Sequence, residues 1–253
     1  MTNKLITLTA SAALAVMASA ALASTPAAKP EPKKTATPQQ LAANALPPAS
    51  NVAAAAAPAA SPGATYAING FRTATFGMTE DQVKAAIARD LGVSADKIRS
   101  ETNALQHTSA LTVQTALPPG PGDATVTYIF GASSHTLMHV NVIWSTGATP
   151  STADRGAIAA AGLQLANYFR TQAWDPKTPV RAGLVGNGAG LLMFDATDPK
   201  GGSVAVEADN IPLSQNVNGN TQSNDPKGAA VLHVSYAKDA AHPDVFAIQN
   251  GAF

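Results

Sequence analysis

The amino-acid sequence predicts an α+β domain in which an antiparallel sheet of about seven strands, built from two related halves, carries two main helices packed on one face. Three observations predict it. Two segments place apolar residues at helical spacing, about seven segments alternate apolar and polar residues, and short turn sequences separate the alternating segments. Strands joined by such short turns run antiparallel, and each half reads as one helix followed by three or more strands.

The first helix is predicted from Thr79 to Leu91. Thr79 and Gln82 have the spacing of a capping box, and the carboxylates of Glu80 and Asp81 stand at the positive end of the helix dipole. Apolar residues then recur on one narrow face, and Gly92 ends the helix.

The second helix is predicted to begin at Ser151-Thr152, with Asp154 in its first turn, and to end before Asp175-Pro176. It has a single apolar stripe. The residues of this stripe are Ile158, Ala161, Gly162, Leu165 and Phe169. One narrow apolar stripe is typical of a helix that lies on a sheet.

Alternation with period two predicts the strands, three in the first half and four in the second. Their ranges are 109–117, 124–130, 136–144, 180–185, 191–196, 203–208 and 229–236. Turn chemistry separates them, as in residues 118–122, residues 131–134, Asn187-Gly188 and residues 200–202.

The same alternation predicts two unlike faces of the sheet. The face expected beneath the helices carries Val126, Tyr128, Phe130, Met138, Val140, Val142, Trp144, Leu192, Phe194, Val204, Val206, Leu232, Val234 and Tyr236. The opposite face carries Thr125, Thr127, His135, His139, Asn141, Glu207, His233 and Ser235, interrupted by Leu137, Ile143 and Met193. Such a mixed face is either simply solvated or a recognition surface.

The N-terminal part of the chain predicts export. Lys4 precedes a mainly apolar stretch, and small residues converge on Ala21-Leu22-Ala23, so residues 1–23 are predicted to be a signal peptide cleaved between Ala23 and Ser24. Residues 24–65 contain 15 Ala and 8 Pro, a composition typical of a disordered tether. A single domain is predicted over residues 66–253, with halves at about 66–148 and 149–253. After signal removal we expect no integral membrane segment, and a periplasmic or secreted protein.

Composition excludes several classes of protein. The chain has no Cys, which excludes disulfides, a thiolate metal site and a cysteine nucleophile. Lys and Arg together number 16, as do Asp and Glu, so the formal net charge is zero and nucleic acid is a poor candidate partner.

No group of residues has the spacing that a catalytic, metal-binding or phosphate-binding site requires. His135 and His139 are four residues apart, but on a strand this separates them by about 13 Å, too far to share a metal ion. The glycine-rich segment 183–190 precedes a strand, whereas a phosphate-binding loop needs a helix there. Glu207 and Asp209 fall on one strand face, and the tripeptide Asp-Pro-Lys, which begins at Asp175, Asp198 and Asp225, fits a repeated turn.

The motif Phe76-Gly77-Met78-Thr79 with Val83, at the head of a small helix followed by antiparallel strands, resembles small outer-membrane-assembly proteins of the SmpA/OmlA type. The tandem layout of helix and sheet also resembles that of the β-lactamase inhibitor protein. With its tail His242-Pro243-Asp244-Val245-Phe246, the chain is similar to an uncharacterised exported proteobacterial family. These resemblances imply an envelope compartment and a helix-plus-sheet fold, but no catalytic residues. Unlike the lipoproteins of the first family, this chain has no anchor cysteine.

We therefore expect an exported, non-enzymatic binding or envelope-interaction module that uses the polar face of its sheet. The expected binding residues are His135, His139, Asn141, Glu207 and His233. No cofactor, metal site or catalytic residue is expected. The expected partner is an envelope protein rather than nucleic acid, and the oligomeric state stays open. Two alternatives remain: an exported hydrolase whose site is assembled only in three dimensions, and a carrier of a small apolar ligand. If the face binds a partner, His139 and His233 would make it sensitive to pH below about 6.5.

Overall fold

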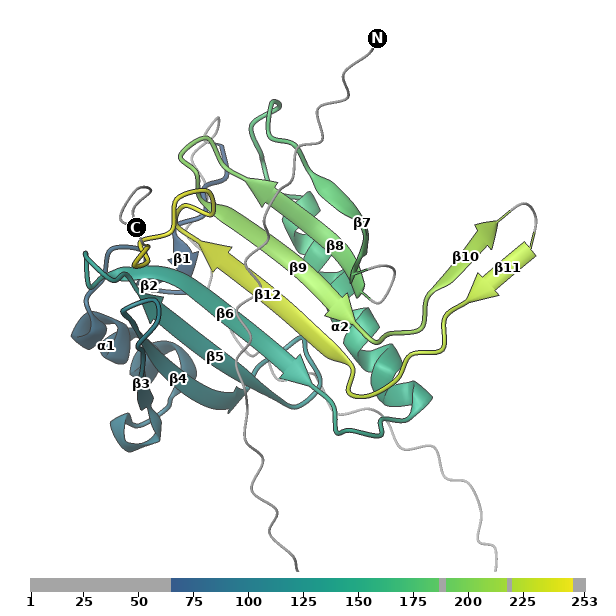
Figure 1. The fold of residues 1–253 in the computed structure, drawn as a ribbon, viewed down its shortest axis with the longest axis horizontal. Helices are drawn as coiled ribbons and strands as arrows, with labels where there is room; N and C mark the ends of the chain where they lie inside the picture. The colour runs from purple at the N-terminus through teal and green to yellow at the C-terminus, as the bar shows by residue number, and fades with distance from the viewer. Residues whose placement is uncertain (1–64, 187–189, 218–219, 248–253) are drawn as a thin grey trace, which may run out of the picture. The chain divides into compact units, whose positions relative to one another are not determined.

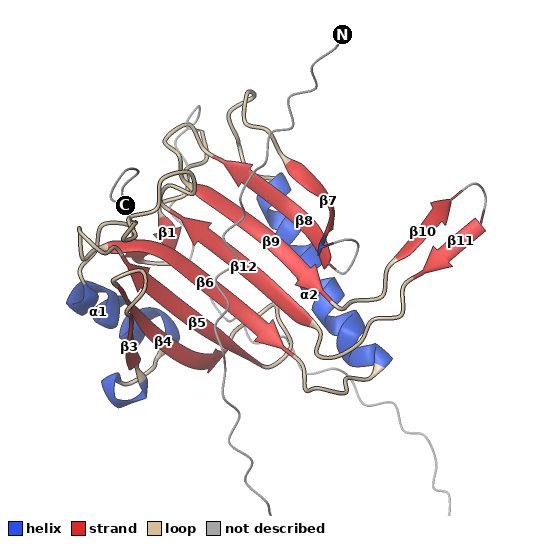
Figure 2. Ribbon diagram, in the orientation of Figure 1, coloured by secondary structure: helices blue, strands red, loops and turns tan. Residues whose placement is uncertain are grey.

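A computed structural model shows one eight-stranded antiparallel sheet, and it confirms the predicted α+β class (Figures 1 and 2). In sheet order, the strands are β3 (Arg99–Asn103), β4 (Thr108–Ala116), β5 (Asp123–Phe130), β6 (Leu137–Ser145), β12 (Val231–Ala237), β9 (Ser203–Asp209), β8 (Gly190–Thr197) and β7 (Arg181–Val185). The structure describes residues 65–186, 190–217 and 220–247. The predicted signal peptide 1–23, the predicted tether apart from Thr65, and the Asn187-Gly188 turn lie outside the described residues.

The sheet order shows the two related halves directly. The helix α1 (Glu80–Leu91) precedes β3, β4, β5 and β6, and the helix α2 (Thr152–Arg170) precedes β7, β8, β9 and β12. From the centre of the sheet to either edge, the strands of each half follow one another in reverse chain order. The two halves meet at the centre, where β6 pairs with β12. The last strand of each half is therefore central and the first is an edge.

The helix α1 begins and ends at the residues that the sequence predicts. The Thr79 side chain accepts a hydrogen bond from the Gln82 N–H, the Gln82 side chain accepts one from the Thr79 N–H, and Gly92 ends the helix in a left-handed conformation. Val83 and Ile87 are buried in the core. The Ser109 hydroxyl of β4 donates to Glu80 Oε1 at 2.7 Å. These contacts place α1 on the apolar face of the first half of the sheet.

The helix α2 lies on the same face of the second half (Figure 2). Ser151 and Asp154 form its capping box. Gly162 allows close packing on the sheet, since a Cβ there would lie 2.5 Å from the Met193 Sδ and 3.1 Å from a Leu232 methyl carbon. Both main helices therefore pack on one face, as predicted.

Five short elements had no sequence signal. The edge strand β3 carries exposed polar side chains without apolar alternation, which is why the sequence indicates about seven strands rather than eight. The others are the pair β1 (Gly70–Phe71) and β2 (Ala74–Thr75), and the hairpin β10 (Ser214–Val217) and β11 (Asn220–Ser223). A 3-10 turn at Ala95–Lys97 links α1 to β3.

Irregular pairing overturns three predicted side-chain directions. Leu192 pairs with Glu207 and Phe194 with Val206, so Met193 is an extra residue in β8. Met193 is consequently buried beside α2, whereas Leu192 shares the polar face with Glu207. Leu137 pairs with Phe130 across a similar irregularity and is fully buried. Simple alternation fails at these positions because one added residue reverses the direction of the next side chain.

The repeated Asp-Pro-Lys tripeptide forms turns, as predicted, at two of its three sites. The Asp175 carboxylate accepts from the Lys177 N–H at 2.7 Å, and the Asp198 carboxylate accepts from the Lys200 N–H at 2.8 Å. Each aspartate carbonyl also accepts from the N–H three residues on.

Asp198 has an additional tertiary role. Its carboxylate is buried and accepts hydrogen bonds from the Ile68 and Gly202 N–H groups at 2.8 and 3.0 Å. It therefore joins the segment that precedes β1 to the β8–β9 turn.

The C-terminal segment runs along one end of the sheet. The Asp244 carboxylate accepts from the Ser133 and Ser134 N–H groups, at 3.1 and 2.8 Å, and thereby holds the turn before β6. Phe246 donates its N–H to the Gln106 carbonyl and stacks on His107 with ring centroids 4.3 Å apart. The tail thus connects two loops that are distant in sequence.

Within residues 65–247, gaps aside, no helix is long and apolar enough to cross a bilayer.

Candidate functional site

The face of the sheet opposite α1 and α2 carries a continuous row of mainly polar side chains, which we call the polar row. Strand register places its members directly opposite one another from β4 to β7. They are Thr112, Thr127, Asn141, Ser235, Ala205, Asp195 and Arg181. A neighbouring row contains Thr125, Ile143, His233, Glu207 and Leu192. We refer to these two rows, together with His139, as the open face.

Hydrogen bonds order the centre of the open face. Nε2 of His139 lies 2.8 Å from the Ser235 hydroxyl, and Nε2 of His233 lies 2.8 Å from Asn141 Oδ1. Because Asn141 Oδ1 can only accept, Nε2 of His233 carries the proton in this pair. The Thr112 and Thr127 hydroxyls are 3.4 Å apart on the adjoining strands. Side chains that are mutually bonded in this way are held in one arrangement.

A charged pair lies at the β7 end of the polar row. Nε of Arg181 donates to Asp195 Oδ2 at 2.6 Å, and a second guanidinium nitrogen also contacts that oxygen. Asp195 is largely buried on its side-chain atoms, whereas Arg181 is exposed. The open face therefore changes from neutral hydrogen-bonding groups at its centre to charged groups on β9, β8 and β7.

Burial shifts the protonation of the four titratable groups near the centre. It lowers the pKa of His139, and together with the nearby His139 it lowers the pKa of His233 to about 4. It raises the pKa of Asp209, and burial followed by the charge of Asp209 raises the pKa of Glu207. Both histidines are neutral at pH 7, so the sensitivity expected near pH 6.5 is displaced to more acidic conditions for His233.

The contact between Ser235 and His139 has the separation of a nucleophile and its general base. Its surroundings do not complete a hydrolytic site. Ser235 lies on β12, which pairs with β6 on one side and β9 on the other, so the backbone N–H groups around it are taken up by the sheet. No free donor pair is then available there to stabilise an oxyanion.

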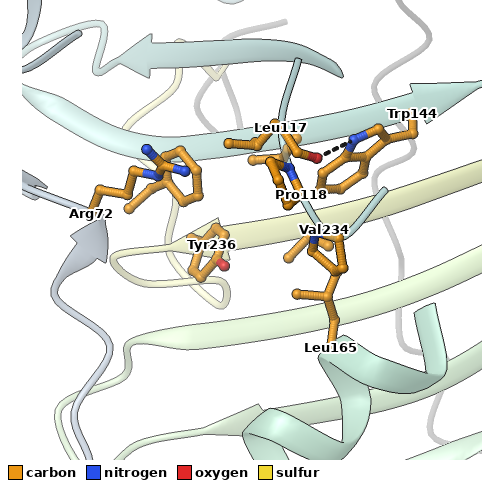
Figure 3. A pocket seen from close by; sticks show the side chains of 10 residues that line it. Arg72, Leu117, Pro118, Trp144, Leu165, Val234 and Tyr236 are labelled. Atoms are coloured by element: carbon orange, nitrogen blue, oxygen red, sulfur yellow. Dashed lines mark hydrogen bonds between the residues drawn. The ribbon is translucent and has the colours of Figure 1, made fainter. Parts of the chain in front are cut away.

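A small pocket lies on the other face of the sheet, where the two halves meet (Figure 3). Its volume is about 120 Å³. The lining includes Arg72, Pro118, Trp144, Leu165, Val234 and Tyr236. None of the predicted binding residues and none of Asp195, Glu207 and Asp209 lines it. In the part of the chain that the structure describes, no group of three or more His, Asp or Glu side chains could hold a metal ion.

The structure brings most of the predicted binding residues together. His139 and Asn141 lie on β6, His233 on the adjoining β12, and Glu207 opposite His233 on β9. His135 does not join them, because it lies exposed in the turn before β6 with a positive φ of 51°.

Sequence reasoning missed two features of this region. One is the contact between His139 and Ser235, which are 96 residues apart. The other is the pair of Arg181 and Asp195. The alternation does place Ser235 on the polar face, but no sequence signal indicates which strand of one half lies beside which strand of the other.

Comparisons with protein-family models, curated proteins and solved structures found no match to the chain. The resemblances to outer-membrane-assembly proteins and to the β-lactamase inhibitor protein therefore stay predictions.

Proposed function

We propose that this protein is an exported, non-enzymatic binding module that recognises an envelope protein with the open face of its sheet. The observation that carries the proposal is the open face, whose polar row crosses seven strands with Ala205 as its one apolar member. At its centre, hydrogen bonds join Ser235 to His139 and Asn141 to His233. An interface built on such preformed groups loses little side-chain entropy when the partner binds.

The side of the sheet that carries the open face is large enough for a protein partner. Eight strands spaced at about 4.8 Å, each rising about 3.3 Å per residue, cover on the order of 700 Å² when they are as long as the seven-residue β9 and β12. A stable protein interface buries roughly 800 Å² on each partner. A partner would therefore contact the open face together with most of the rest of this side of the sheet.

The chemistry of the face indicates what kind of surface it fits. Thr127 and Ser235 offer hydroxyl groups, Ile143 and Leu192 offer apolar contacts, and Glu207 supplies negative charge. A partner surface with exposed backbone or amide groups, a small apolar projection and a basic residue would complement them.

Site-specific photo-cross-linking tests this proposal. A photoreactive amino acid is placed at Ile143 on the open face or, as a control, at Leu163, which is 50% exposed on α2. With the whole chain expressed in its own cells, the Ile143 probe is expected to trap one dominant envelope protein and the Leu163 probe not to trap it. The substitution Glu207→Lys should weaken binding of the purified partner at least about tenfold. Equal cross-linking from both positions, or none from Ile143, would contradict the proposal.

Export is tested separately. The small-residue motif that ends at Ala23 predicts cleavage before Ser24. Mass spectrometry of the protein recovered from its native cells should find a chain that begins at Ser24 in the periplasmic or secreted fraction. An intact Met1 or Thr2 terminus in the cytoplasmic fraction would exclude export by this route.

A further inference from the structure

The pocket between the two halves combines parts that are remote in sequence. Arg72 comes from the β1–β2 turn, Pro118 from the β4–β5 loop and Leu165 from α2. Trp144 on β6 and Tyr236 on β12 supply side chains from the two central strands. The close-up view shows Arg72 and Tyr236 on one side of this space, and Trp144 and Leu165 on the other (Figure 3).

Apolar groups form most of the wall, and tight packing holds them in place. The Trp144 indole N–H donates to the Leu117 carbonyl at 3.0 Å, which fixes the start of the Pro118-Pro119 segment against the sheet. A Cβ at Gly120 would lie 2.2 Å from the indole nitrogen, so the loop approaches the ring closely. Trp144 is only 2% exposed. Rigid aromatic and proline surfaces of this kind suit a flat apolar ligand.

Arg72 brings a positive charge to the edge of the pocket. Its guanidinium carbon lies 5.7 Å from the centre of the Phe71 ring, and one nitrogen donates to the Asp90 carbonyl at 2.6 Å. Among the described residues it has no carboxylate within salt-bridge distance, since Asp90 is bonded to Thr73 and Arg89. The remaining guanidinium N–H groups can therefore receive an anion.

Tyr236 supplies a hydroxyl donor from the wall of the same pocket. Its ring packs between those of Phe71 and Phe169, at centroid distances of 5.6 and 6.2 Å. Its hydroxyl has no hydrogen-bond partner in residues 65–247 as the structure describes them. Burial, followed by the neighbouring phenols of Tyr66 and Tyr168, raises the pKa of Tyr236, so its hydroxyl keeps its proton and can act as a donor at pH 7.

We propose that this pocket binds a small aromatic monocarboxylate, with its ring beside Trp144, Pro118 and Leu165 and its carboxylate on Arg72 and the Tyr236 hydroxyl. One cation and one hydroxyl match a single negative charge, whereas a phosphate dianion would need more donors. The pocket, at about 120 Å³, is somewhat smaller than the enclosed apolar cavities of about 150 Å³ that hold benzene, but it opens to solvent, so one ring can enter with its carboxylate at the mouth. This site lies on the opposite face from the proposed recognition surface and does not depend on it.

Titration of the whole chain into 4-fluorophenylacetate, followed by ¹⁹F NMR, tests the proposal. We expect a saturable change in the resonance at millimolar or lower concentration. The neutral analogue 4-fluorophenylacetamide should bind about tenfold more weakly. Arg72→Gln is expected to weaken binding of the acid about tenfold and Tyr236→Phe several-fold, both with little effect on the neutral amide.

A matched pair of variants separates the pocket from other surfaces. Leu165→Trp fills the pocket and should abolish binding, whereas Leu163→Trp adds the same ring to the exposed side of α2 and should leave binding intact. Circular dichroism and thermal unfolding verify that each variant is folded. No saturable binding to the folded wild-type chain would overturn the proposal, and so would binding that survives both Leu165→Trp and Arg72→Gln.

Discussion

Replacement of Asp198 with alanine is expected to lower the free energy of unfolding by about 3 kcal/mol. The buried Asp198 carboxylate accepts from the backbone N–H groups of Ile68, Lys200 and Gly202. Ile68 and Gly202 are themselves buried, so their donors would lose their partner in a place that water reaches poorly. Urea denaturation followed by tryptophan fluorescence measures this change.

Asp175 provides the matched control. It begins the same Asp-Pro-Lys tripeptide and makes the same bond to the N–H two residues on, but no hydrogen bond joins it to a distant part of the chain among the described residues. Asp175→Ala should therefore cost less than about 1 kcal/mol. Equal losses from the two substitutions would mean that the tertiary bond from Ile68 contributes nothing measurable.

Acidification from pH 7 to pH 4 is expected to destabilise the protein through His233. The folded-state pKa of His233 is about 4, well below the ordinary value of 6.5. Between these values the unfolded chain binds the proton and the folded chain does not, so stability falls as the pH falls from about 6.5 to about 4. The shift corresponds to at most about 3 kcal/mol from this residue.

The acidic neighbours of His233 act in the opposite direction. Burial raises the pKa values of Glu207 and Asp209, so these two carboxylates bind protons more readily in the folded protein than in the unfolded chain. Their protonation therefore adds to the stability of the folded protein as the pH falls. The pKa of His139 is also lowered, so His139, like His233, reduces the stability of the folded protein as the pH falls. The net change in the wild-type protein therefore combines opposing contributions and does not by itself isolate that of His233.

Comparison of His233→Gln with the wild-type protein isolates that contribution. Glutamine retains a donor for Asn141 Oδ1 but cannot take up a proton, so the loss of stability between pH 7 and pH 4 should be smaller in the variant. His135→Asn is the control, because His135 is exposed in a turn and asparagine tolerates its positive φ. A pH profile for His233→Gln identical to that of the wild type would show that His233 is not the titrating group.

Local chemistry made much of the fold predictable. Both helix starts follow from capping boxes at Thr79 and Ser151, which are contacts within four residues of the chain. The seven predicted strands exist because alternation of apolar and polar residues allows one side of a strand to be buried. The edge strand β3 escaped prediction because little of it is buried, so it has no such alternation.

The site was predictable only in part. Alternation placed Asn141, His139 and His233 on one face, but their pairing depends on which strands of the two halves meet at the centre. A one-residue bulge at Met193 moved Leu192 to the open face, and no local pattern announces such an insertion.

The sequence by itself determined both main helices, seven of the strands and the polarity of most of the sheet, because these depend on neighbours within a few residues. Only the tertiary structure decided what the remote groups do. It joined His139 to Ser235, bonded the Asp198 carboxylate to the Ile68 N–H, and placed Arg72 and Tyr236 in the wall of one small pocket. These contacts link residues about 100 or more positions apart, and they exist because the two halves pack as one sheet around a shared core.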